Sequence, residues 1–336
     1  MLRKLIALSV VTMMTLLLLE VLSRQFLRDY ALPARFVARV ENWHYNYRNP
    51  QEYQFSKELG YEPIPGGFYY NDWGVLRNDL SLENESGVRR ILFLGDSVTR
   101  RRIYIDRLET LLKADYPESR FDIWNAAVEG YNAVQYSRYY RRQAAAIKPD
   151  LCVVGFHMND FTSTPVAFHD EERLVVFSPG RSIYKTGLYH PWLFEHSTFY
   201  RVTLMVLEER LFKSEQFHRE IYEDTLQALR DIKRISRKNG TEVVILVLPY
   251  IKPLLEYSAV EQENYRGLLS FLQEEQIPYL DLHPVFEQTG WDQIRGRAGD
   301  GLTDGPKDPW HPSGTGHEKI GDVLFGYLSR NWLSEA

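Results

Sequence analysis

Short apolar runs alternate with amphipathic stretches from about residue 89 to the end of the chain. Residues 91–94 form a continuous apolar run, which is the pattern of a strand buried on both faces of a sheet. Further strands are predicted in chain order at residues 121–125, 151–155, 242–248 and 279–282. Strands that alternate with helices form parallel βαβ units, so the pattern predicts a three-layer α/β/α sandwich around a mostly parallel five-stranded sheet.

The segments between the predicted strands carry apolar residues at helical spacing. Tyr104, Leu108 and Leu112 predict a helix after the first strand. Other helices are predicted at residues 133–147, 215–238, 258–275 and 314–333. Local signals support two of these boundaries, because Asn239-Gly240 is a favourable C-terminal cap and Ser258-x-x-Glu261 is a capping box.

The chain begins with an apolar segment that follows Arg3 and Lys4 and extends from residue 5 to residue 22, interrupted at Glu20. A helix of this length spans roughly 27 Å, close to the ~30 Å hydrocarbon core of a bilayer. No small-residue cleavage site follows, so we expect an uncleaved signal anchor, with a cleaved signal peptide as the alternative. A single span of this kind leaves the remaining chain in the periplasm or outside the cell, attached to the cytoplasmic membrane.

These patterns divide the chain into three parts. Residues 1–24 form the transmembrane segment, and residues 25–88 are aromatic and polar and read as a stem with some strand. Residues 89–336 form the α/β domain, with an insertion at 161–214 after the third strand. Long ordered insertions near strand ends are often lids or binding loops, so we expect this insertion to contribute to ligand specificity. The insertion's helix could equally cover the sheet.

Composition excludes several classes of protein. The chain is 44% hydrophobic and 25% charged, which is typical of a folded globular protein. Its 40 basic and 45 acidic residues give a net charge of −5, which does not favour binding to nucleic acid. The single cysteine, Cys152, excludes an internal disulfide and lies in an apolar run that predicts burial.

Groups able to do chemistry follow the predicted strands. Ligands of such sheets bind beyond the carboxyl ends of the strands. Ser97 follows the first strand at the start of a helix, where backbone N–H groups face a developing negative charge. Gly130 follows the second strand, Asn159 follows the third, and Asp308-Pro-Trp-His311 precedes the last helix. Each signal alone is also typical of an ordinary turn or cap, so their order and common placement carry the argument.

That ordered set resembles the SGNH (GDSL-type) esterase and lipase family, from about residue 89 to the C-terminus. Residues 91–98 (ILFLGDSV) resemble its first block, residues 125–130 its second, Asn159-Asp160 its third and residues 308–312 (DPWHP) its fifth. The region from residue 59 to residue 77 loosely resembles the pre-domain of membrane-anchored bacterial members. The resemblance implies a flavodoxin-like sheet.

The resemblance also implies a role for each group. Ser97 is then the nucleophile, His311 the general base and Asp308 the residue that orients it. Ser97 N–H, Gly130 N–H and the side chain of Asn159 are the implied oxyanion-hole donors. Histidine is suited to this task because it exchanges a proton near neutral pH, and aspartate stabilises the imidazolium.

One position departs from the family pattern. The family usually has glycine two residues before the block-three asparagine, and this chain has His157. A bulky side chain there could narrow the site or reshape the turn that aims Asn159.

We predict no cofactor and no metal ion. His317 follows His311 by six positions and could join Asp304 or Asp308 as a ligand, but the other ligands of a metal site are not visible in the spacing. Packing at the start of the last helix is the expected role of His317.

The leading hypothesis is a membrane-anchored serine esterase that removes acyl groups, with acetyl preferred, from a glycan of the cell envelope. An O-acyltransferase of exopolysaccharide modification would use the same triad. A catalytically silent glycan-binding or assembly protein is a third hypothesis, supported only by His157. The expected partners are a carbohydrate-linked acyl ester and the lipid bilayer, with no nucleic acid.

Overall fold

The computed structural model describes residues 2–28, 44–48, 51–76, 82–83, 86–170, 173–178, 188–212, 215–297 and 307–334. The chain forms two compact units. Unit 1 consists of Met1–Glu62 and Ser163–Glu220, and unit 2 consists of Pro63–Thr162 and Ile221–Ala336.

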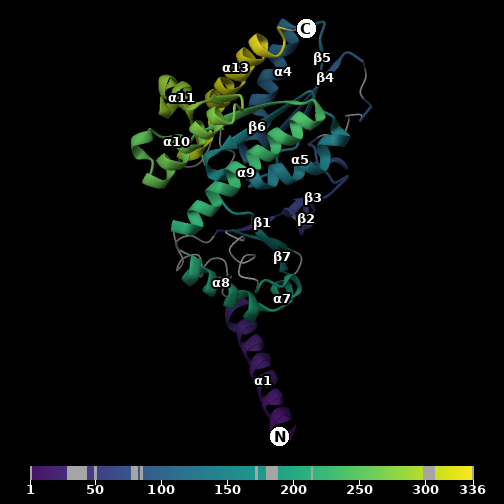
Figure 1. The fold of residues 1–336 in the computed structure, drawn as a ribbon, viewed down its shortest axis with the longest axis vertical. Coiled ribbons are helices and arrows are strands. Elements are labelled where there is room, and N and C mark those ends of the chain that lie inside the picture. Colours follow the sequence, from purple (N-terminus) through teal and green to yellow (C-terminus); the bar gives the residue numbers. More distant parts are fainter. Residues whose placement is uncertain are drawn as a thin grey trace. The chain divides into compact units, whose positions relative to one another are not determined.

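Unit 2 contains the predicted sheet (Figure 1). Its strands are β4 (Val88–Gly95), β5 (Arg120–Asn125), β6 (Leu151–His157), β9 (Glu242–Leu248) and β10 (Tyr279–Asp281). They lie in the order β10-β9-β6-β4-β5, and every neighbouring pair is parallel. The predicted five-stranded parallel sheet is therefore confirmed, with the strand order of a flavodoxin-like fold.

Helices cover both faces of this sheet. Against one face lie α4 (Ile103–Asp115), α11 (His283–Thr289), α12 (Trp291–Ile294) and α13 (Gly314–Asn331). Their apolar side chains share a core with sheet residues such as Phe93, Val153 and Leu246. Across the other face lie α5 (Ala133–Ile147) and α9 (Glu215–Asn239), as Figure 1 shows. Helix α10 (Ala259–Glu274) packs beside α9. The helical boundaries agree with those predicted to within a few residues.

Two local details follow from the sequence. The capping box at the start of α10 is formed, because Ser258 N–H donates to the Glu261 carboxylate at 2.6 Å and Glu261 N–H donates to Ser258 Oγ at 3.3 Å. Strand β6, predicted to end at Gly155, continues to His157, which is buried and paired with Leu248 of β9. The extension carries His157 to the edge of the sheet where the candidate site lies.

Unit 1 combines the N-terminal helix, part of the predicted stem and most of the predicted insertion. It contains α1 (Leu2–Ser23), the π-helix η1 (Arg24–Arg28), β1 (His44–Arg48), β2 (Tyr53–Ser56), β3 (Gly60–Pro63), β7 (Val166–Asp170), β8 (Arg173–Ser178), α7 (Pro191–His196) and α8 (Thr198–Phe212). Strand β1 pairs antiparallel with β8, which pairs with β7. A strand of the predicted stem and two strands of the predicted insertion therefore share one sheet. The domain boundaries drawn from the sequence stay a prediction.

Among the described residues, one helical segment, Arg3–Phe26, is long and apolar enough to cross a membrane. None of its most apolar window is buried against the rest of the protein. A signal peptide near an N-terminus has the same length and composition, so permanent anchoring stays a prediction.

Candidate active site

Ser97 stands directly after the first strand of the sheet. Strand β4 ends at Gly95, Asp96 is the N-cap, and Ser97 is the first residue of α3 (Ser97–Arg100). The Asp96 carboxylate accepts a hydrogen bond from Val98 N–H at 3.0 Å, which satisfies a donor that the helix start would leave unpaired. The cap fixes the turn that carries the Ser97 hydroxyl.

Two glycines allow α3 to lie close to the sheet. A Cβ atom on Gly95 or Gly155 would come within 2.2 Å or 2.3 Å, respectively, of Thr99 Oγ1. The Thr99 hydroxyl accepts a hydrogen bond from the Tyr104 hydroxyl at 3.0 Å, and the Asn125 amide donates to Thr99 C=O at 3.0 Å. Both glycines are therefore needed for close approach of the backbone.

The His311 imidazole lies between Ser97 and Asp308. Ser97 Oγ is 2.9 Å from His311 Nε2, and His311 Nδ1 is 2.5 Å from Asp308 Oδ2. The other carboxylate oxygen of Asp308 accepts a hydrogen bond from Trp310 N–H at 2.8 Å. The side chain of His311 is 27% exposed and that of Asp308 is 15% exposed. Solvent can therefore reach the imidazole while the carboxylate is mostly covered.

A short hairpin and a capped helix position the last two groups. Asp308 and His311 belong to β12 (Lys307–Pro312), which pairs antiparallel with β11 (Arg295–Arg297). Ser313 follows and caps α13, accepting a hydrogen bond from Gly316 N–H at 3.2 Å. The histidine thus stands at the start of the final helix, as predicted from the sequence.

Gly130 and Asn159 follow the strands on either side of β4. Gly130 lies in the loop after β5 with a φ of +73°, and Asn159 lies in the 3₁₀ helix η2 (Met158–Asp160) after β6. In a parallel sheet these two loops and Ser97 share one edge. Val128 N–H donates to Gly95 C=O at 3.0 Å and holds the β5 loop against the end of β4.

His157 is built into the turn that carries Asn159. Its side chain is 1% exposed, and its Nδ1 accepts a hydrogen bond from Asn159 N–H at 3.3 Å. Nε2 has no partner at hydrogen-bond distance among the described residues. Burial lowers the pKa of His157, while the Asp96 carboxylate, the Asn159 side chain and the nearby Trp310 backbone oppose this lowering. The residue is therefore a neutral acceptor for the asparagine turn.

Asp160 is a buried carboxyl group beneath the same turn. Its two oxygens accept hydrogen bonds from the Tyr136 hydroxyl at 3.0 Å and from His157 N–H at 3.2 Å. Burial, reinforced by the nearby Asp96 carboxylate, raises the pKa of Asp160 well above its usual range. The sequence identified Asp160 only as the neighbour of Asn159, because the burial of the Asp160 carboxyl group depends on the tertiary fold.

Tyr250 is a residue of this site that the sequence analysis missed. Its ring packs edge-on against His157 and against Trp310, with centroids 5.8 Å apart in each pair. The Tyr250 hydroxyl donates to Met158 C=O at 3.1 Å. Tyr250 follows β9, so the end of the fourth strand was the signal that could have found it.

Two arginines that follow Ser97 in the sequence, Arg100 and Arg102, bond to other residues of the protein. Arg100 Nε donates to the Tyr70 hydroxyl at 3.0 Å, and Arg102 pairs with Asp106 at 3.1 Å. The thiol of Cys152 is buried, and burial raises its pKa.

His317 is completely buried and stacks on Tyr104, with ring centroids 6.2 Å apart. Burial, with Arg101 and His311 nearby, lowers the pKa of His317 to about 3. Within the described ranges, no cluster of three or more His, Cys, Asp or Glu could hold a metal ion. Asp304, the other ligand considered from the sequence, lies outside the described residues.

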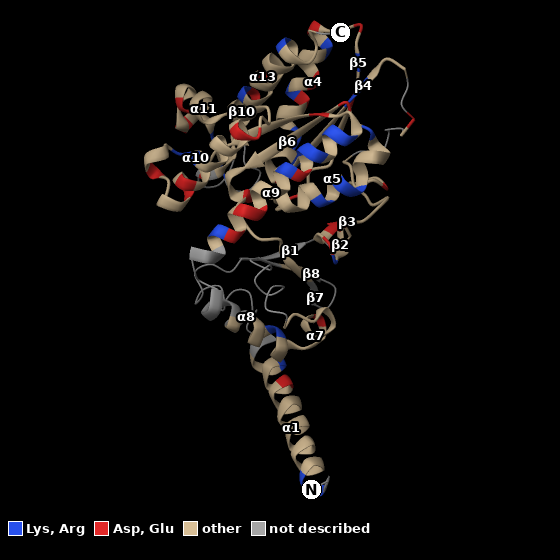
Figure 2. Ribbon diagram, viewed as in Figure 1, with Lys and Arg blue, Asp and Glu red and all other residues tan. Residues whose placement is uncertain are grey.

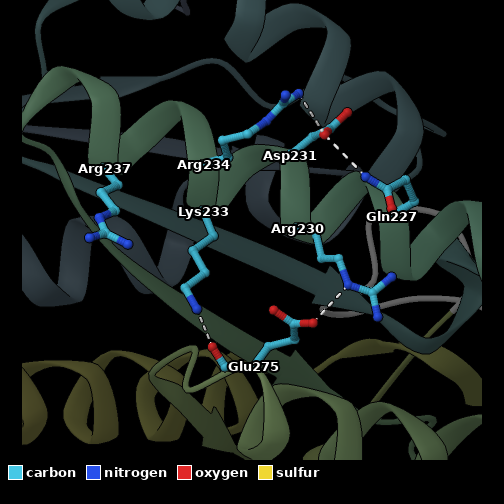
Figure 3. A pocket seen from close by; sticks show the side chains of 7 residues that line it. All are labelled: Gln227, Arg230, Asp231, Lys233, Arg234, Arg237 and Glu275. Atoms are coloured by element: carbon cyan, nitrogen blue, oxygen red, sulfur yellow. Dashed lines mark hydrogen bonds and ion pairs between the residues drawn. The ribbon is translucent and has the colours of Figure 1, made fainter.

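An open hollow of about 410 Å³ lies along α9, apart from the residues described above (Figure 3). Most residues of its lining are charged, and several of them pair with one another. Arg230 bonds the Glu275 carboxylate at 2.8 Å, Lys233 donates to the Glu275 carbonyl, and Arg234 pairs with Asp231 at 2.9 Å. None of the residues implied by the resemblance lines this hollow.

A parallel α/β sheet whose carboxyl edge carries a hydrogen-bonded serine, histidine and aspartate is the arrangement of a serine hydrolase. Residues 93–319 match the GDSL-like lipase/acylhydrolase family, and the chain belongs to it. The protein is accordingly an esterase or acylhydrolase of the SGNH type, which confirms the predicted enzyme class.

Two solved structures illustrate how distant the similarity is. TesA is 13% identical, with 72% of this chain and 99% of that chain covered and a TM-score of 0.43. The acetylxylan esterase Axe2 from Geobacillus stearothermophilus is 14% identical, with 73% and 95% covered and a TM-score of 0.46. No curated protein sequence matches the chain.

Proposed function

We propose that the protein hydrolyses acyl esters through an acyl-enzyme formed on Ser97. The observation that carries this proposal is the hydrogen-bonded series from Ser97 through His311 to Asp308. A serine hydroxyl is a weak nucleophile until a base accepts its proton, and His311 Nε2 lies 2.9 Å from it. The carboxylate of Asp308 holds the imidazole in the tautomer that can accept this proton.

The reaction proceeds in two halves. Ser97 Oγ attacks the ester carbonyl carbon while His311 accepts the hydroxyl proton. The resulting oxyanion accepts hydrogen bonds from Ser97 N–H, Gly130 N–H and the Asn159 side chain. The carbon–oxygen bond to the alcohol breaks as His311 returns the proton to it. Water then attacks the carbonyl carbon of the acyl-serine while His311 takes a proton from the water. The bond from that carbon to Ser97 Oγ breaks as His311 returns the proton to Oγ, and the free acid leaves.

We propose an O-acetylated or similarly acylated glycan of the cell envelope as the substrate. The support for this class is the apolar helix Arg3–Phe26, which as an uncleaved anchor would hold the catalytic unit beside surface polymer. In this proposal the chain crosses the cytoplasmic membrane once, and the catalytic unit faces the periplasm or the cell exterior. The mass of the mature protein tests whether the helix is retained.

A direct test uses the full-length chain in detergent with an acetyl ester and a fluorophosphonate probe. We expect ester hydrolysis and covalent labelling, both lost in Ser97→Ala and kept in Ser270→Ala, a control at an exposed serine of α10. Labelling that persists in Ser97→Ala contradicts the assignment of the nucleophile. Absence of both labelling and turnover in the wild type favours the silent glycan-binding alternative.

The same assay separates hydrolysis from acyl transfer. Water and a sugar hydroxyl can both attack the acyl-serine, and the triad serves either acceptor. Adding an acceptor oligosaccharide leaves the rate of free acetate release unchanged if the protein is a hydrolase. A product that forms only with the acceptor, at the expense of free acetate, identifies a transferase instead.

A further inference from the structure

The carboxylate of Glu20 joins the apolar helix α1 to a distant part of unit 1. Glu20 accepts hydrogen bonds from the Ser197 hydroxyl at 2.7 Å and from the backbone N–H groups of Thr198 and Phe199 at 3.0 Å each. Arg24 pairs with Glu20 at 2.6 Å. All these residues belong to unit 1.

The contacts of Glu20 cap a helix that lies far along the chain. Thr198 and Phe199 begin α8, and their N–H groups are donors that a helix start leaves without partners. The carboxylate also complements the positive end of the α8 dipole. Arg24 adds a second tie, because its Nη2 donates to His196 C=O at the end of α7 at 2.7 Å. The end of α1 is therefore fixed to α7 and to the start of α8.

The position of this joint along α1 corresponds to a membrane boundary. Charged residues of α1 occur only near its two ends (Figure 2). Arg3 and Glu20 are separated by a helical rise of roughly 26 Å, close to the ~30 Å hydrocarbon thickness. If Arg3 lies at one surface of a bilayer, Glu20 reaches the opposite surface.

Large apolar side chains are exposed close to this joint. Trp192 is 59% exposed and stacks on His196, with ring centroids 4.7 Å apart. Leu188 is 55% exposed, and its C=O accepts a hydrogen bond from the Tyr200 hydroxyl in the first turn of α8. Phe26, in the π-helix that continues α1, is 58% exposed. Tryptophan favours the membrane–water interface, where its ring is buried and its N–H remains hydrated.

We propose that Phe26, Leu188 and Trp192 form an interfacial platform that lies in the boundary between headgroups and acyl chains of the bilayer that α1 crosses. Unit 1 then rests on the membrane at a fixed height and is not tethered by a freely moving stalk. The Glu20 joint sets that height because it ties the helix to α7 and α8. This inference rests on the proposed anchoring and is independent of the esterase chemistry.

The test uses the full-length protein in vesicles made of brominated phosphatidylcholine and phosphatidylglycerol. Bromine atoms placed either near the headgroups or near the chain ends quench tryptophan fluorescence at that depth. We expect shallow bromines to quench the wild type, and Trp192→Phe to lose most of this quenching. The control is Trp291→Phe, which also removes one tryptophan. Trp291 packs against the core of unit 2, so this variant should keep the quenching by shallow bromines.

A second pair of variants tests the joint. Glu20→Ala removes the acceptor that ties α1 to α8, so we expect the Trp192 signal to lose its preference for shallow bromines. Thr15→Ala is the matched control, because the Thr15 hydroxyl donates within α1, to Val11 C=O at 2.9 Å. It should leave the depth preference unchanged.

Two outcomes would overturn the inference, and they are distinguishable. If alkaline washing removes the protein from the vesicles, the anchoring fails together with the platform. If the protein is retained but shallow bromines quench the fluorescence of Trp192→Phe as strongly as that of the wild type, only the proposed platform is contradicted. Ester hydrolysis measured on the same samples reports separately on the proposed function.

Discussion

At the scale of the residue, Asn159 depends on its neighbours for its proposed task. Its backbone N–H donates to His157 Nδ1, which holds the turn that carries the proposed oxyanion donor, the side-chain amide of Asn159. We expect Asn159→Ala to lower kcat by a factor on the order of 10²–10³, with little change in KM, because a donor used in the transition state is removed. Steady-state kinetics with an acetyl ester measures this.

Asn331→Ala is the control for this prediction, since Asn331 is exposed on α13 and its side chain donates to Tyr327 C=O of the same helix at 2.9 Å. It should keep wild-type kinetics. An unchanged kcat in Asn159→Ala would remove Asn159 from the oxyanion hole.

His157 is the second prediction at this scale. Its Nδ1 accepts the Asn159 N–H, and its ring packs against Tyr250. We expect His157→Asn to retain kcat, because an amide oxygen can replace the acceptor. His157→Phe keeps a ring but leaves the Asn159 N–H unpaired, so kcat should fall by roughly tenfold, with KM less affected. The opposite ranking of the two variants would mean that His157 only fills space.

At the scale of the element, helix α3 lies so close to the sheet that glycine is required at the strand positions facing Thr99. A Cβ on Gly155 would lie 2.3 Å from Thr99 Oγ1. We therefore expect Gly155→Ala to destabilise the fold by about 1–3 kcal/mol. Adding Thr99→Ala removes the clashing hydroxyl and should recover part of that loss, so the two effects are not additive. Chemical denaturation of the single and double variants measures the coupling.

Gly314→Ala is the control, because a Cβ there meets no atom within 4 Å. Its unfolding free energy should remain close to that of the wild type. Strict additivity of Gly155→Ala and Thr99→Ala would show that the two positions do not clash.

At the scale of the whole molecule, buried neutral histidines make stability depend on pH. Burial lowers the pKa of His317 to about 3, below the ordinary histidine value of 6.5, with Arg101 and His311 as the nearby charged or titratable groups and Tyr104 stacked on the ring. The unfolded chain therefore binds a proton that the folded chain excludes between these two pH values. The contribution of neutral His317 to the free energy of unfolding is present above pH 6.5 and is lost as the pH falls towards 3.

We expect His317→Phe to reduce the slope of unfolding free energy against pH in this window by up to about 1.4 kcal/mol per pH unit, the value for one proton. Both ring nitrogens of His317 lack partners among the described residues, so phenylalanine removes no observed hydrogen bond. His317→Gln provides a second variant that does not titrate. Denaturant titrations from pH 3 to pH 7 test the prediction, and slopes equal to that of the wild type in both variants would contradict it.

The strands of the sheet could be predicted from local sequence. Residues 91–94 and 151–155 are continuous apolar runs, and only a strand covered on both faces buries every residue of such a run. The start of α10 was equally readable, because Ser258 and Glu261 satisfy each other's backbone donors within one turn. The family resemblance also rested on such short local blocks.

Other parts of the fold carried no local signal. Strand β1 alternates Tyr45 and Tyr47 with polar residues over only five positions, and this short pattern does not identify its partner, β8, which lies more than a hundred positions later. The capping of α8 by Glu20 also joins residues distant in sequence. Contacts of this kind depend on how elements pack, which composition and spacing do not describe.

The amino-acid sequence by itself determined the alternation of strands and helices, the helix caps and the chemical groups placed at the strand ends, because these depend on neighbours a few residues apart. Only the tertiary structure decided that Ser97 Oγ and His311 Nε2, 214 positions apart, lie 2.9 Å from each other. It also decided that His157 and Asp160 are buried beneath the same edge. The reason is physical: hydrogen-bond distance, desolvation and the pKa shifts that follow from them arise from packing between elements, and local sequence does not specify that packing.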